Sequence, residues 1–108
     1  MSTQIFEKIG IEFQDQFDVV SGQMFGKPCL KTAMNKAFVA YHNEQMVFKL
    51  GVEEIAKVKA GYPLGKNWDP SGKNRAMKDW LALPSTYVED WESLAKVALD
   101  FVENASAK

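Results

Sequence analysis

The chain begins and ends with apolar residues at helical spacing. A stripe that repeats every four positions predicts a first helix over residues 2–19. A broader stripe after Pro84 predicts a long last helix, in which Thr86 and Glu89 form a capping box. The first stripe consists of Ile5, Ile9, Phe13 and Phe17, and the last of Val88, Trp91, Ala95, Ala98 and Val102, widened by Tyr87, Leu94 and Phe101.

Between these helices, short apolar runs separated by turn residues predict strands of an antiparallel meander. Alternation places Phe38 and Ala40 on one face of this sheet and Val39 and Tyr41 on the other. The strands are expected at residues 23–25, continued after Gly26-Lys27-Pro28 by 29–34, and then at 37–41 and 45–50. A short helix is expected at 52–60, closed by Gly61 with a positive φ.

A second hairpin is predicted before the last helix. Asp69-Pro70-Ser71-Gly72 carries the residue preferences of a type I turn, which should join strands at 64–68 and 75–83. The element order therefore predicts an α+β fold. In this fold the N-terminal, the short middle and the long C-terminal helices pack on one face of an antiparallel sheet made of the meander and the hairpin.

The composition favours one domain over residues 1–108, because 46% apolar residues supply a single hydrophobic core for a chain of 108 residues. One cysteine, Cys29, forms no internal disulfide and supplies one thiolate, which argues against a secreted scaffold and a zinc site. No run approaches the roughly 18 apolar residues of a membrane helix, and the first residues lack a signal region. We expect a cytoplasmic protein without contact with a membrane.

A net charge of −1 conceals a segregation along the chain. Residues 21–84 carry nine Lys and one Arg against five acids, whereas residues 1–20 and 85–108 are each acidic by three charges. Two explanations are open: acidic helices pack beside a basic sheet without further meaning, or the basic middle forms an anion-binding face.

The groups most often used in catalysis all have structural interpretations. His42 lies at a predicted turn without a partner nucleophile, and we expect a buried, inert thiol at Cys29. The adjacent acids Glu53-Glu54 and Glu89-Asp90 fall in first helical turns, where they favour the helix dipole. The sequence therefore predicts no catalytic residues, no cofactor and no metal site.

The best candidate for a binding site is the second hairpin, where basic and aromatic side chains alternate. Long Lys and Arg stems over an apolar surface give such a mixture, and so does a sheet face that binds an anionic or aromatic group. The candidate binding residues are Lys49, Trp68, Arg75, Lys78 and Trp80.

Several motifs resemble the TfoX/Sxy N-terminal-domain family over residues 10–103. These are Met24-Phe25-Gly26, Phe48-Lys49-Leu50, and the segment 69–84 with its Asp-Pro-Ser-Gly start, Met77-Lys78-Asp79-Trp80 and Pro84. The resemblance implies an α+β domain, shared with the related YjbR-like proteins, and a bacterial-type cytoplasmic regulatory or binding module. It transfers no catalytic residue. The competence regulators that name the family carry a second, helical domain that we do not expect in a chain of this length.

Three functions are compatible with these features. The leading hypothesis is a non-enzymatic module that binds a protein or a small anionic ligand, possible also as a homodimer through a sheet edge or apolar face. The second is nucleic-acid binding, against which the net charge argues. The third is an enzyme with a pocket between the sheet and the long helix, using Cys29 or His42.

Overall fold

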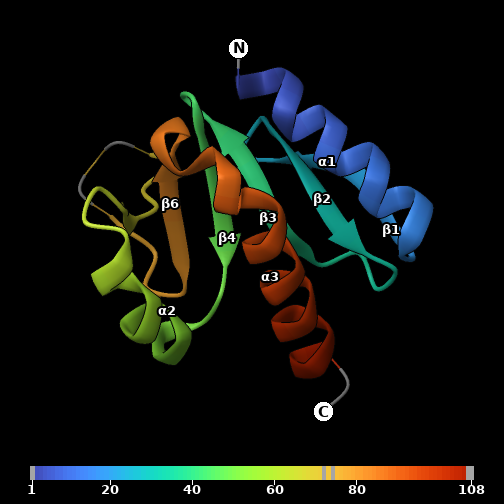
Figure 1. The fold of residues 1–108 in the computed structure, drawn as a ribbon. Coiled ribbons are helices and arrows are strands. Elements are labelled where there is room, and N and C mark those ends of the chain that lie inside the picture. The colour runs from blue at the N-terminus through green and yellow to red at the C-terminus, as the bar shows by residue number, and fades with distance from the viewer. Residues whose placement is uncertain (1, 72, 74, 107–108) are drawn as a thin grey trace.

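The computed structural model describes residues 2–71, 73 and 75–106, and within them the predicted α+β fold is confirmed (Figure 1). Three α-helices accompany one six-stranded antiparallel sheet. The elements are α1 (Ser2–Gln16), β1 (Val19–Met24), β2 (Lys27–Thr32), β3 (Ala37–His42), β4 (Gln45–Lys49), α2 (Val52–Val58), η1 (Lys59–Gly61), β5 (Lys66–Asn67), β6 (Trp80–Pro84), η2 (Ser85–Asp90) and α3 (Trp91–Ser106).

The sheet has the strand order β1-β2-β3-β4-β6-β5, so the first four strands form the predicted meander. Two-residue turns with positive φ at both positions join β1 to β2 at Phe25-Gly26 and β3 to β4 at Asn43-Glu44. Such turns match the twist of the flanking strands, which explains why the meander closes tightly. The strand β6 returns beside β4, and the two-residue β5 completes the far edge.

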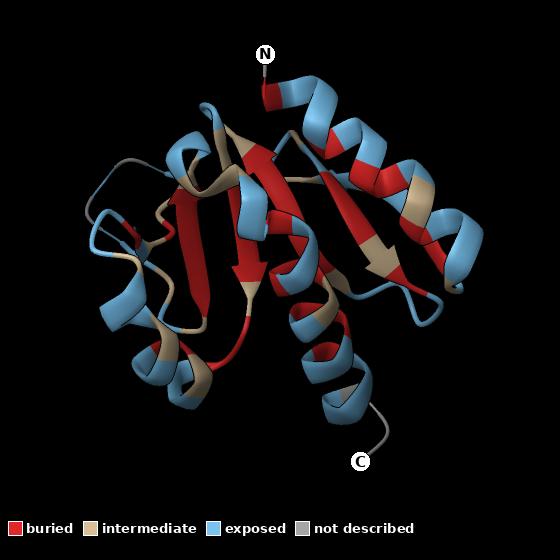
Figure 2. Cartoon of the chain, viewed as in Figure 1, coloured by how far each residue is buried: buried red, intermediate tan, exposed pale blue. Residues whose placement is uncertain are grey.

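All three helices lie on one face of the sheet (Figure 1): α1 contacts β1, α3 contacts β3 and β4, and α2 contacts β6. Their apolar sides and the facing strand residues form the main core. Figure 2 shows that β3, β4 and β6 are buried over most of their length, whereas α1 and α3 expose their outer sides.

A bulge in β3 overturns the predicted alternation of that strand. Leu30 pairs with Val39, but the next residue of β2, Lys31, pairs with Ala37, so Phe38 is an extra residue. Phe38 and Val39 therefore both belong to the main core, where alternation alone would have separated them.

The opposite face of the sheet carries a second, smaller core, which we call the open-face core. Cys29, Ala40, Val47 and Ala82 lie on one row of paired strand positions. Trp68 and Met77, near the two ends of the segment 68–79, pack on this row, since Trp68 belongs to the cluster and Met77 packs against it. The full membership is Cys29, Ala40, Val47, Trp68, Trp80 and Ala82.

The predicted second hairpin is much shorter than expected. Only Lys66–Asn67 and Trp80–Pro84 are strands, in place of 64–68 and 75–83. The chain leaves the ladder at Trp68, whose amide donates to the carbonyl of Trp80 at 3.1 Å, while its own carbonyl accepts from the amide of Met77 at 2.8 Å. The predicted type I turn extends to position 72, which lies outside the described residues.

Three other boundaries differ from the expectation. The first helix ends at Gln16, because Val19 already begins β1, and the interrupted strand at 23–34 is in fact the β1–β2 hairpin. Gly61 does not have a positive φ, because the 3-10 turn η1 closes α2 with a bond from the amide of Tyr62 to the carbonyl of Lys59.

The capping box before the last helix is not formed. Thr86 and Glu89 instead lie inside the 3-10 helix Ser85–Asp90, whose N-cap Pro84 makes no side-chain capping bond, and α3 begins only at Trp91. The aromatic ring of Tyr87 in this segment packs edge-on against Tyr62, with ring centroids 5.0 Å apart. Its hydroxyl also accepts a hydrogen bond from the amide of Leu64 at 3.0 Å, so tertiary contacts hold this turn.

Candidate functional site

The structure separates the five residues proposed from the sequence into two groups. Trp68 and Trp80 are only 2% and 4% exposed, and their ring centroids lie 5.4 Å apart inside the open-face core. Arg75 and Lys78 are exposed on the loop of residues 68–79. Lys49 is half-buried at the end of β4, with its Nζ 4.0 Å from Oδ2 of Asp79. The two tryptophans therefore support the surface from below.

Trp68 connects the loop to the β-meander. Its indole Nε1 donates a hydrogen bond to Nδ1 of His42 at 3.1 Å. Its ring also meets the ring of His42 and the ring of Phe25 edge-on, each with centroids 6.1 Å apart. The sequence placed His42 at a turn, whereas it is the half-buried last residue of β3.

The surroundings of His42 favour the neutral form of its ring. Burial lowers the pKa of the His42 imidazole, and the nearby positive charge of Lys27 lowers this pKa further. Because Nδ1 accepts the bond from Trp68, the neutral ring carries its proton on Nε2. His42 is therefore a hydrogen-bond donor beside a lysine.

Phe25 is a surface residue that sequence reasoning did not select. It is 62% exposed at the tip of the β1–β2 hairpin, and its φ is 53°. An aromatic residue is uncommon in this backbone region, where Gly, Asn or Asp cost less. The motif Met24-Phe25-Gly26 contained the signal, because a two-residue turn between strands requires positive φ at Phe25.

Four lysines occupy strand positions on the same face of the sheet as the open-face core, and one of them, Lys49 at the end of β4, also lines a hollow with Phe101 and Val102 of α3. Each is paired across strands with a residue that belongs to this core or packs against it: Lys27 with Met24, Lys31 with Ala37, Lys49 with Trp80, and Lys66 with Ala82. Paired residues of an antiparallel ladder point to the same face. We call this surface the basic face, consisting of Phe25, Lys27, Lys31, His42, Lys49 and Lys66.

No acid occupies a strand position on the basic face among the described residues. Loop acids nearby are engaged: Asp79 lies beside Lys49, and the carboxylate of Asp69 accepts bonds from the amides of Ser71 at 3.1 Å and Arg75 at 2.8 Å. The acids of α1 and α3 belong to the other layer. The strand lysines and the acids of the terminal helices therefore lie on opposite sides of the sheet, while the basic middle segment also places Lys57 on the helical side, in α2.

The loop that covers the open-face core is fixed at its base. The side-chain amide of Asn67 donates to the carbonyls of Met77, Lys78 and Trp80 at 3.1–3.3 Å. The carbonyl of Asp79 accepts from the amides of Leu50 and Gly51, both at 3.1 Å. These bonds, with the burial of Trp68, hold the exposed side chains of the loop on a defined base.

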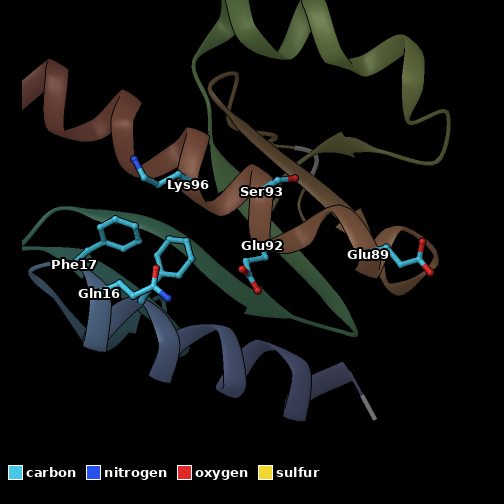
Figure 3. A pocket seen from close by; sticks show the side chains of 7 residues that line it. Gln16, Phe17, Glu89, Glu92, Ser93 and Lys96 are labelled. Atoms are coloured by element: carbon cyan, nitrogen blue, oxygen red, sulfur yellow. The ribbon is translucent and has the colours of Figure 1, made fainter.

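A second candidate is a cleft of about 490 Å³ between α1 and α3 (Figure 3). It is lined by Gln16 at the end of α1, by Phe17 just after it, and by Glu92, Ser93 and Lys96 of α3; Figure 3 shows Ser93 directed away from Gln16 and Phe17. The ammonium of Lys96 is bound to Asp100 at 2.7 Å, and the hydroxyl of Ser93 donates to the carbonyl of Asp90 at 3.1 Å. The cleft therefore has room for a small group, but its serine is turned toward the backbone.

The remaining reactive group, Cys29, is buried as expected. Burial raises the pKa of the Cys29 thiol, and Lys31 only partly opposes this effect. Over residues 2–71, 73 and 75–106, no cluster of three His, Cys, Asp or Glu side chains has the arrangement of a metal site. In the same part of the chain, no helix has the length and apolar character needed to cross a membrane.

Comparison of this chain with protein-family models, with curated proteins and with solved structures gave no match. The resemblance to the TfoX/Sxy N-terminal domain therefore stays a prediction from the motifs.

Proposed function

We propose that this chain is a non-enzymatic interaction module that binds an acidic segment of another protein through its basic face. One observation carries the proposal: strand positions on this face hold four lysines and no acid, within a chain whose net charge is −1. Charged surfaces of one sign attract and orient partners of the opposite sign. The family resemblance, with its bacterial regulatory or binding modules, supports the same class of function.

Phe25 gives the basic face an apolar contact point. Phe25 is mostly exposed and has a positive φ, a conformation that costs Asn or Gly less free energy than an aromatic residue. Backbone strain of this kind is often retained at binding sites. The edge-on contact of Phe25 with Trp68 leaves most of the Phe25 ring free. An acidic segment that also carries an apolar residue would therefore contact Lys27 and Phe25 together.

An acidic polypeptide fits this surface better than a nucleic acid. Binding of single strands relies on exposed aromatic rings on which bases stack. Trp68 and Trp80 are buried, so Phe25 alone would offer such a ring among the three. An enzymatic role for Cys29 is disfavoured by its burial and raised pKa.

Fluorescence anisotropy with a labelled glutamate-rich peptide containing one leucine tests the proposal. We expect binding that weakens as salt rises, because surface charges are screened. Lys27→Glu should weaken it about tenfold, which corresponds to ~1.4 kcal/mol. The matched control is Lys57→Glu on α2, an exposed lysine in the other layer, which should bind like the wild type.

Labelled single-stranded DNA is titrated separately in the same assay, and free citrate is added as an unlabelled competitor. Equal affinities of Lys27→Glu and Lys57→Glu for the peptide would show that the basic face is not the site. Tighter binding of DNA than of the peptide would replace the proposal with the nucleic-acid hypothesis. Saturable binding of citrate alone would assign the face to a small anion.

A further inference from the structure

The edge strand β1 lacks the usual protection against pairing with another chain. It is the first strand of the sheet order and spans six residues, Val19–Met24, without a charge, a proline or a bulge in its pairing with β2. Natural edge strands are commonly short, charged or distorted, because free backbone groups recruit further strands. The opposite edge, β5, has only two residues.

The register shows which groups of β1 are free. The two-residue turn closes the pair Met24 and Lys27, so alternate residues from Met24 backward bond to β2, and the others point outward. Val19, Ser21 and Gln23 are the outward residues. The amide of Val19 donates to the carbonyl of Phe17 at 2.9 Å, which leaves Ser21 and Gln23 as the two residues at the free edge.

Apolar side chains flank this edge on both faces of the sheet. Val20 is 49% exposed on the basic face, since it is paired with Lys31. On the helical face, Ile11 of α1 is 68% exposed. It borders a hollow of about 280 Å³ that Gly10 and Ser21 also line. The exposed side chain of Ile11 and the hollow that it borders therefore lie side by side along the β1 edge.

We propose that a second copy of this chain pairs with β1 in antiparallel orientation, around a two-fold axis at Gly22. This register brings the free groups of Ser21 opposite those of Gln23 of the second copy, and Val20 opposite Met24. Gly22 then faces itself in the closest kind of pair, and the side chain of Lys31 lies where a Cβ of Gly22 would stand, with its Cε 3.1 Å from that position. Because α1 lies over β1, the two α1 helices run side by side, and each Ile11 faces the hollow of the other copy.

A second copy suits this edge because a two-fold rotation places each free amide or carbonyl of one β1 strand opposite a partner group of the other. An isologous interface needs a patch that is complementary to itself, and an uncharged strand with a matched donor and acceptor row provides it. The axis stands perpendicular to the sheet, so both basic faces lie on one side. If the proposed function holds, a long acidic partner can engage both faces at once.

Sedimentation velocity over a range of concentrations tests the pairing. We expect wild-type protein to reach twice the mass of one chain as its concentration rises. Val20→Lys should shift the transition to at least tenfold higher concentration, because it places a charge on each side of the axis. Val52→Lys, at an exposed valine of α2, is the matched control and should dimerise like the wild type.

Amide exchange followed by NMR on the wild-type protein provides a second measurement that does not depend on the folding of a variant. The amides of Ser21 and Gln23 should gain protection as concentration rises. Wild-type protein that keeps the mass of one chain at near-millimolar concentration would overturn the proposal. So would a dimer in which these two amides exchange as fast as in the monomer, or one that Val20→Lys and Val52→Lys affect equally.

Discussion

Replacement of Trp68 by alanine separates a core role from a ligand-contact role. The side chain is 2% exposed, packs against Trp80 with ring centroids 5.4 Å apart, and donates a hydrogen bond to Nδ1 of His42. Truncation of a buried tryptophan removes transfer free energy and leaves a cavity, which costs about 3–5 kcal/mol. A domain of this size has a total stability of ~5–15 kcal/mol, so Trp68→Ala should lose a large share of it.

Urea unfolding followed by far-UV circular dichroism measures this loss. We expect a lower midpoint with little change in the slope. Arg75→Ala on the same loop is the control, because its exposed side chain should change the stability by no more than about 0.5 kcal/mol. Trp68→Phe keeps a ring but removes the indole donor, and it should cost about 1 kcal/mol for the lost hydrogen bond plus a packing loss.

A loss below about 1 kcal/mol in Trp68→Ala would refute the reasoning, because no fully buried tryptophan in a packed core is so cheap to remove. It would mean that the loop of residues 68–79 does not hold Trp68 on the sheet in solution. The basic face would then include an exposed tryptophan, and the nucleic-acid hypothesis would regain its stacking ring.

Three further outcomes follow from the structure. Because the pKa of His42 is lowered in the folded protein, the unfolded chain binds a proton at this residue at higher pH than the folded protein does. The free energy of unfolding should therefore fall as pH drops below about 6.5 and level off below the pKa of folded His42. Urea midpoints of the wild type and of His42→Gln, measured across this pH range, test this expectation. Gly51→Ala should cost ~1–3 kcal/mol, because Gly51 has φ 86° and ψ 156° and its Cβ would lie 2.6 Å from the ring of Phe101; an unchanged thermal midpoint would contradict this. Cys29 should react with a thiol reagent at neutral pH only after unfolding in urea, and rapid labelling of the native protein would show that the open-face core opens.

The elements that follow from local periodicity were predicted well. The stripe at Ile9 and Phe13 gave the first helix, because burial there repeats with the helical period. The short apolar runs between turn residues gave β3 and β4, whose inner positions are all buried. The prediction was wrong at the turn that separates β1 from β2, because residues 23–34 were predicted as one interrupted strand. At Phe25-Gly26, an aromatic residue adopts positive φ, which propensity disfavours and the hairpin imposes.

The candidate site shows the same division. The sequence alone determined that charge is segregated and that residues 68–80 carry two tryptophans together with three basic residues, because these are counts along a chain. Only the tertiary structure decided that Trp68 and Trp80 lie beneath the surface while Lys27 and Phe25 lie on it. Burial depends on which segment packs across the sheet, and the loop reaches the open face through contacts with His42, which lies 26 positions earlier in the chain. Local patterns do not contain such long-range contacts, so the sequence located the segment, and the fold selected its exposed residues.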